Sequence, residues 1–143
     1  MKLSFTMTLI LLPVAAFAAD GVPGAHFIQN WDLNSDAVVT ADELRERRSD
    51  VFYTFDSDED GVLTAEEYTY FDEARALDMQ GQGDHGQGRM KRVNDGMTLA
   101  FNDLNADGTV SRDEFVGQVD AWLALIDRNG DGEVTQADFG PNG

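Results

Sequence analysis

Four copies of a twelve-residue segment constrain the fold of this chain more than any other feature. The copies begin at Asp32, Asp56, Asp103 and Asp127, so consecutive starts lie 24, 47 and 24 residues apart in a chain of 143 residues. Internal repeats of this kind mark one structural unit that is used several times. The equal outer intervals predict two similar halves, each with two copies.

Oxygen-bearing side chains occupy the same places in every copy. Asp or Asn fills the first, third and fifth positions, and Glu, or Asp in the last copy, fills the twelfth. These candidate ligands are Asp32, Asn34, Asp36 and Glu43; Asp56, Asp58, Asp60 and Glu67; Asp103, Asn105, Asp107 and Glu114; and Asp127, Asn129, Asp131 and Asp138. Glycine, or Ala37 in the first copy, stands at the sixth position, where a sharp turn needs positive φ. Short oxygen ligands at alternate positions suit a hard divalent cation.

This spacing is the D-x-[DN]-x-[DN]-G-x5-E pattern, and the chain resembles the EF-hand family of calcium-binding proteins, in a secreted, bacterial-type form with four hands. The resemblance implies backbone carbonyl ligands at the seventh positions, which are Val38, Val62, Thr109 and Glu133. It also implies bridging waters held by the ninth positions, which are Thr40, Thr64, Ser111 and Thr135. The expected cofactor is Ca²⁺, with Mg²⁺ as a further candidate at loop four because Asp138 is one methylene shorter than Glu.

The residues around the four loops (one, 32–43; two, 56–67; three, 103–114; four, 127–138) predict helix, loop and helix in turn. An apolar residue stands four places before each loop and another directly after it. Thr or Ser at position nine, followed by Glu or Asp at position twelve, predicts a capping box that starts each exiting helix. Apolar eighth residues, which are Val39, Leu63, Val110 and Val134, predict short β-contacts between loops. The fold class expected is all-α.

We expect two lobes, an EF-hand pair in residues 22–79 (loops one and two) and another in residues 89–143 (loops three and four). Residues 80–88 between them hold four glycines and no apolar side chain, so they predict a flexible linker of roughly 15 to 18 Å and semi-independent lobes. Pairing within a lobe requires a tight turn near Ser49 and another near Asp120. The alternative is one unbroken helix, which would hold the loops roughly 18 Å apart and prevent their pairing.

Departures from the pattern rank the sites. Ala37 in a left-handed conformation costs on the order of 1 kcal/mol, which weakens loop one. Asp138 can reach an ion with one oxygen only, and the chain ends soon after it, which weakens loop four. The predicted order of affinity is two, three, four, one.

The first nineteen residues predict a signal peptide. Lys2 precedes an apolar run over residues 3–17, and Ala16 and Ala18 have the spacing that signal peptidase reads. A retained anchor is the alternative, but the run is shorter than the ~20 residues that span a bilayer. The expected location is the periplasm or the outside of the cell.

The charge and composition exclude several classes of protein. With 27 Asp and Glu against 10 Lys and Arg, the net charge of −17 disfavours nucleic acid as a partner. The absence of Cys excludes disulfides, thiolate zinc sites and cysteine nucleophiles. His26 and His85 stand beside no recognisable nucleophile, so we expect no catalytic residues and no enzyme. The basic clusters at 45–48 and 89–92 are interpreted as solvated helix faces, with a docking role as the alternative.

Two functions remain open beyond calcium binding itself. One is an exported Ca²⁺ buffer or structural calcium-binding module. The other is a sensor or adaptor that exposes an apolar groove to a protein partner. Only Met79, Met90 and Met97 follow the signal segment, which disfavours a Met-rich sensor surface. The short last helix, however, is expected to leave Phe115, Trp122 and Phe139 poorly covered. A non-catalytic subunit of a secreted enzyme is a third reading.

Overall fold

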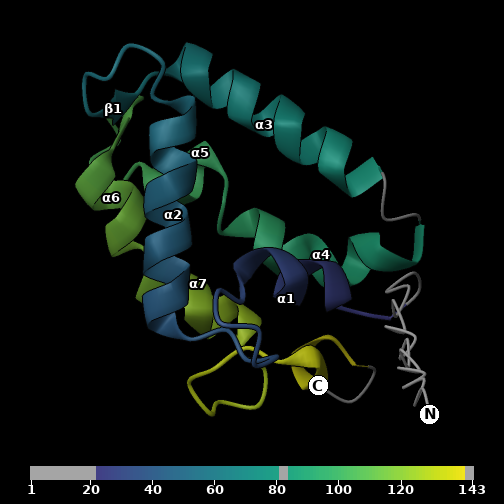
Figure 1. Cartoon of the computed structure of the whole chain (residues 1–143). Helices are drawn as coiled ribbons and strands as arrows, with labels where there is room; N and C mark the ends of the chain where they lie inside the picture. Colours follow the sequence, from purple (N-terminus) through teal and green to yellow (C-terminus); the bar gives the residue numbers. More distant parts are fainter. Residues whose placement is uncertain (1–21, 81–83, 141–143) are drawn as a thin grey trace, which may run out of the picture.

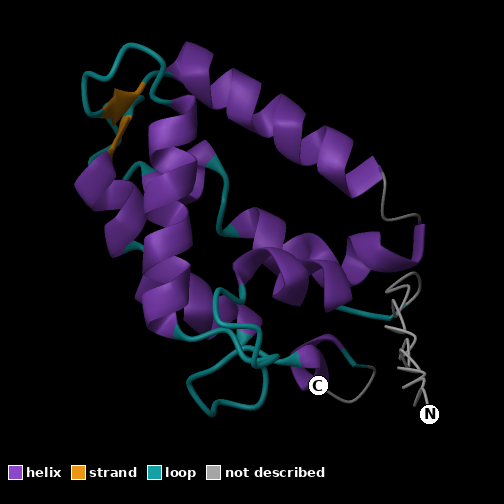
Figure 2. Cartoon of the chain, in the orientation of Figure 1, coloured by secondary structure: helices purple, strands orange, loops and turns teal. Residues whose placement is uncertain are grey.

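The computed structural model describes residues 22–80 and 84–140, and it is mostly helical (Figures 1 and 2). In chain order the elements are α1 (Ala25–Trp31), α2 (Ala41–Phe55), β1 (Val62–Leu63), α3 (Ala65–Gln80), α4 (Asp84–Asp95), α5 (Leu99–Asn102), β2 (Val110–Ser111), α6 (Arg112–Gly117), α7 (Val119–Ile126) and the 3-10 helix η1 (Gln136–Phe139). The predicted helical fold with small β-contacts is confirmed. The predicted signal peptide, residues 1–19, lies outside the described residues.

The helices begin where the capping residues predict. The Thr40 side chain accepts a hydrogen bond from the Glu43 N–H, and the Glu43 carboxylate accepts one from the Thr40 N–H at 2.9 Å. The same reciprocal pair forms at Ser111 with Glu114, and at Thr135 the hydroxyl accepts from the Ala137 N–H while Asp138 accepts from the Thr135 N–H. Each pair satisfies two N–H groups that the first helical turn leaves without partners. The last candidate ligand of a loop is therefore also part of the first turn of the exiting helix.

The segment between loops one and two is one unbroken helix, so the predicted turn near Ser49 is wrong. α2 runs without interruption for 15 residues and contains neither Gly nor Pro, so nothing in it breaks the hydrogen-bond ladder. The equivalent segment between loops three and four does break, at Gln118, two residues before the predicted turn at Asp120. Gly117, a poor helix former, immediately precedes that break.

The loops pair across the two halves, and the predicted pairing within each half is wrong. β1 of loop two pairs antiparallel with β2 of loop three, with Val62 opposite Ser111 and Leu63 opposite Val110. Val39 of loop one forms a bridge with Val134 of loop four. The cause is α2, which holds loops one and two at its opposite ends (Figure 1). α2 packs along α6 and α7, so the halves lie side by side.

The described residues do not confirm two separate lobes, because both halves contribute to one core. α3 extends to Gln80 and α4 begins at Asp84, so only residues 81–83 of the predicted linker lie outside the described residues. The aromatic residues that were expected to be poorly covered are packed: Trp122 and Phe139 lie against α1, and Phe115 lies against rings of α2 and α3. The Phe27 and Phe139 rings lie 5.6 Å apart, and the Trp31 and Trp122 rings lie 4.7 Å apart. Phe115, Trp122 and Phe139 are buried.

Two side chains lie opposite to where the sequence pattern put them. Leu77 follows Tyr68 and Phe71 in the apolar stripe of residues 65–79, which predicts an inward side chain, yet it is 68% exposed near the end of α3. Arg48, predicted to lie on a solvated face, is completely buried where α2 packs against the other half of the molecule. Among the described helices, none combines the length and apolar character that a membrane crossing needs.

Candidate metal centres

All four loops share one backbone winding. The sixth residue has positive φ in each, at Ala37 (68°), Gly61 (82°), Gly108 (85°) and Gly132 (86°). The fourth residue does too, at Ser35 (62°), Glu59 (57°), Ala106 (57°) and Gly130 (76°). The sequence pattern predicted only the sixth position, since Gly130 alone signals the fourth. Ala37 adopts the turn in spite of its side chain, as the ranking of loop one assumed.

The first aspartate of every loop is held inside this turn by backbone N–H groups. In loop two, Asp56 accepts from the Asp60 N–H at 3.1 Å through one oxygen and from the Gly61 N–H at 3.0 Å through the other. Asp32, Asp103 and Asp127 accept from the fifth and sixth N–H groups of their own loops in the same way. The backbone of each loop thus holds its first carboxylate in place.

Loop two brings three carboxylates together. Asp56, Asp58 and Asp60 each place one oxygen within 4.8 Å of the others. The pKa of Asp58 is raised, first by partial loss of solvent and then by the charges of Asp60, Glu67 and Asp56, against the Asp60 N–H that lowers it. Crowded like charges of this kind are relieved by a bound cation. The donor set is entirely oxygen, which suits Ca²⁺ or Mg²⁺ better than zinc or copper.

The twelfth carboxylate spans the loop. Glu67 accepts from the N–H and hydroxyl of Ser57, both at 2.8 Å, and from the N–H and hydroxyl of Thr64, both at 2.9 Å. These bonds, the Thr64 N–H foremost and against the opposing effect of burial, lower the pKa of Glu67 to about 2. The carboxylate is therefore ionised at neutral pH. Hydrogen bonds also lower the pKa of Glu114, with the Ser111 N–H as the largest cause, and that of Glu43, where they outweigh burial.

Loop four makes the same contacts with a shorter acid. Asp138 is 1% exposed and accepts from the Arg128 N–H at 2.9 Å through one oxygen and the Thr135 N–H at 2.8 Å through the other. The residue lies in the 3-10 helix η1, whose tighter turn differs from the α-helices that follow the other loops. Both Asp138 oxygens thus accept from the N–H groups of the second and ninth loop positions, as the Glu67 oxygens do in loop two. The shorter side chain is therefore a weaker reason to expect low affinity at loop four.

The seventh and ninth residues have clear hydrogen-bonding roles. The N–H groups of Val38, Val62, Thr109 and Glu133 donate to the fifth-position carboxylates at 2.9 to 3.0 Å. The Thr109 hydroxyl adds a bond to Asp107 and is the largest cause of its lowered pKa. The hydroxyls of Thr40, Thr64, Ser111 and Thr135 cap the exiting helices. The carbonyl and water-bridging roles of these positions stay predictions.

His26 has a structural partner. Its ring lies 2.8 Å from Asp78 of α3 and 3.0 Å from the Asn30 side chain, so it links α1 to the end of α3. This pairing was not visible in the sequence, because 52 residues separate the two partners.

Comparison with known proteins agrees with the geometry of three loops. A family model described as EF hand matches residues 49–69, 100–116 and 119–140, which contain loops two, three and four. A search of curated proteins found no match. EF-hand proteins are typically non-enzymatic and bind Ca²⁺ in such loops. The three matches, with the acidic cluster of loop two, support an EF-hand calcium-binding family for this chain.

Proposed function

We propose that this protein binds Ca²⁺ through its loops and serves as an exported Ca²⁺ buffer or structural calcium-binding module. The observation that carries the proposal is loop two, where Asp56, Asp58 and Asp60 converge and Glu67 closes the loop in ionised form. Four carboxylates around one turn repel one another, so a divalent cation both neutralises and orders the loop. Loop two is the strongest site, followed by three, four and one.

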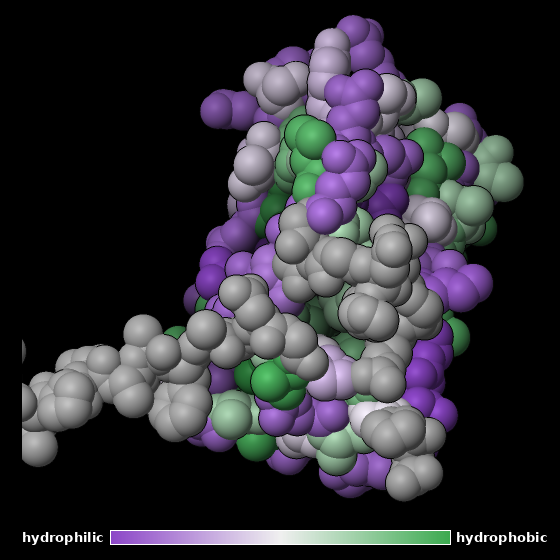
Figure 3. All heavy atoms as spheres, turned by 90° about the vertical axis from the view of Figure 1, so that its right-hand side faces the viewer, coloured by the Kyte–Doolittle hydropathy of each residue, from purple (hydrophilic) through white to green (hydrophobic). Residues whose placement is uncertain are grey.

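A buffer is favoured over a sensor because the apolar side chains are already packed. Eighteen buried hydrophobic residues from both halves form one cluster. Where the described residues are visible in Figure 3, apolar residues occur as small patches among hydrophilic ones. A module of this kind takes up ions without presenting a new surface.

One observation favours the sensor as the second candidate. Met79, Met90 and Met97 line a single cavity of about 140 Å³ with Trp31 and Phe71, between α1, α3 and α4. The three methionines are few in the sequence, but the fold gathers them. Methionine side chains adapt readily to different partners. A calcium-dependent rise in the fluorescence of a hydrophobic dye would favour the sensor function, provided that the rise is reduced when Met79 is substituted.

Export to the periplasm or the medium rests on residues 1–19. Amino-terminal sequencing of the protein from a cell fractionation tests it. We expect the mature chain to begin near residue 19 or 20 and to be found outside the cytoplasm. An intact Met1 on cytoplasmic protein would refute it.

Calorimetric titration with Ca²⁺, followed by Mg²⁺, tests the function itself. Trp31 and Trp122 lie together near loops one and four, with Trp31 directly before loop one, so tryptophan fluorescence reports chiefly on that end. Heat should therefore be released by the tighter sites before the fluorescence changes. If the fluorescence changed at the same calcium concentration as the first binding heat, the predicted order of the sites would be wrong. Absence of any binding heat would refute calcium binding.

A further inference from the structure

One buried polar network touches every helix that flanks loops two and three. α2 enters loop two and α3 leaves it, while α5 enters loop three and α6 leaves it. Arg48 of α2, Tyr68 of α3, Asn102 of α5 and Phe115 of α6 are each at most 1% exposed. Their contacts connect the stems of two candidate metal sites inside the core.

Arg48 holds both stems of loop three. Its Nε donates to the Phe115 carbonyl at 2.7 Å, and its Nη2 donates to Asn102 Oδ1. Phe115 directly follows Glu114, and Asn102 directly precedes Asp103. The guanidinium also lies 4.2 Å from the centre of the Phe115 ring and 4.9 Å from that of Trp122. A planar group with this many partners fixes the angle between its two stems.

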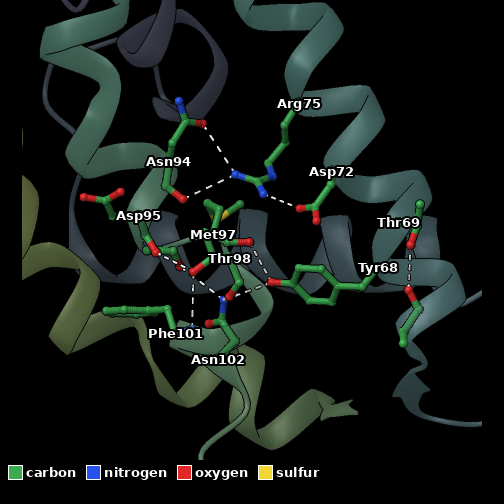
Figure 4. A network of polar contacts seen from close by, with 12 residues as sticks. Tyr68, Thr69, Asp72, Arg75, Asn94, Asp95, Met97, Thr98, Phe101 and Asn102 are labelled. Carbon is green, nitrogen blue, oxygen red and sulfur yellow. Dashed lines mark hydrogen bonds and ion pairs between the residues drawn. The ribbon is translucent and has the colours of Figure 1, made fainter. Parts of the chain in front are cut away.

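Asn102 extends the network to the exit of loop two. Its Nδ2 lies 3.1 Å from the Tyr68 hydroxyl, which in turn donates to the Met97 carbonyl at 2.6 Å (Figure 4). Tyr68 directly follows Glu67. A separate bond joins the helices of loop three again, from the Gln118 side chain to the Phe101 carbonyl at 2.7 Å.

Separating these helices would be costly. Burial lowers the pKa of Arg48 to about 10, so the side chain remains a cation at neutral pH. Its hydrogen-bond partners are all uncharged groups. Movement of α6 away from α5 would break the bond from Arg48 Nε to the Phe115 carbonyl and leave part of a buried cation without its acceptor, which is unfavourable. Sensor hands open in just this way when Ca²⁺ binds.

We propose that Arg48, Asn102 and Tyr68 form a latch that keeps the four helices around loops two and three closed when Ca²⁺ binds. Arg48 is its main positioning residue. The inference rests on the proposed calcium binding and accounts for the buffer behaviour: the ion orders the loops, and the latch prevents this ordering from becoming an opening of the helices.

The distance between α5 and α6 tests the latch. The chain has no Cys, so Ala100→Cys with Gly117→Cys gives two unique labelling sites, both exposed. A side chain at position 117 meets nothing within 4 Å. Pulsed electron paramagnetic resonance on the spin-labelled protein should give the same distance with calcium and with chelator. Adding Arg48→Met should make the distance increase with calcium, and Arg48→Lys should restore part of the closure.

Arg45→Met is the matched control, because Arg45 lies one turn earlier on α2 and makes surface ion pairs to Asp42 and Asp120. It should stay closed. Two results would overturn the latch. One is a calcium-dependent increase of the distance between α5 and α6 in the protein that keeps Arg48, and the other is a folded Arg48→Met protein whose distance does not change with calcium. Should Arg48→Met fail to fold, Tyr68→Phe takes its place with the same expectation. Calorimetry on the labelled samples separates the two proposals: absence of heat refutes calcium binding, whereas heat together with opening in the protein that keeps Arg48 refutes the latch alone.

Discussion

The two ends of the molecule carry the same loops on different supports. Loops two and three share a two-stranded sheet and a buried polar network, with Gly at position six and Glu at position twelve of both. Loops one and four share a single bridge, between Val39 and Val134, beneath a cluster of aromatic rings. Loop winding is therefore set locally, whereas the contacts that support each loop depend on which helices the fold places beside it. Changes confined to one end can therefore separate the two contributions.

The largest expected effect is at the aromatic end. A Cβ on Gly24, where φ is +77°, would meet the Phe139 ring at 2.1 Å. We expect Gly24→Ala to lower the free energy of unfolding by about 3 kcal/mol, through overpacking and backbone strain. Denaturant titration measures it. Gly117→Ala is the control, because its Cβ meets nothing within 4 Å, and it should be neutral or stabilising. Equal effects of both changes would show that the aromatic end is not tightly packed.

The next effect is at the polar end. Tyr68→Phe removes the hydroxyl that bonds Met97 and Asn102 and leaves the Met97 carbonyl without this buried donor, so the free energy of unfolding should fall by about 1–3 kcal/mol. Tyr53 is 63% exposed, and Tyr53→Phe in the same assay should change little. A neutral Tyr68→Phe would mean that apolar contacts alone support this end.

Charge removal compares the metal sites themselves. Glu67→Gln keeps the size of the side chain but removes the ionised carboxylate that closes loop two. We expect at least about a tenfold loss of calcium affinity at the tightest site, since even outer-shell changes cost this much. Asp138→Asn should affect only the weaker transitions, those seen by tryptophan fluorescence. Calorimetry decides between them, and the reverse pattern would make loop four the dominant site.

The smallest effect concerns the backbone of loop one. Ala37 has φ 68°, and Ala37→Gly should relieve about 1 kcal/mol of strain, raising calcium affinity at that end by the same amount. Ala41→Gly, in the first turn of α2, removes a methyl group at a helical position. It should destabilise the helix that leaves loop one and lower the calcium affinity there. The fluorescence midpoint of the calcium titration measures both. No gain from Ala37→Gly would mean that the turn is not what weakens loop one.

The sequence predicted what is local in this molecule. The loops, the positive φ at position six, the capping boxes and the apolar eighth residues follow from short-range chemistry, and the structure has them all. The pairing of the loops could not be predicted, because it depends on α2 being one continuous helix. That helix separates loops one and two, so Val39 pairs with Val134 of loop four. Burial of Arg48 escaped for the same reason: its partners are 48 to 67 residues away, and the surrounding arginines are typical of a solvated face.

An anomalous difference map from crystals grown with calcium would locate the cations in these loops. We predict peaks inside loops two and three, between the Asp56, Asp58 and Asp60 carboxylates in the first and beside Asp103, Asp107 and Glu114 in the second. Well-ordered loops without anomalous density, under conditions that saturate extracellular calcium modules, would contradict the account.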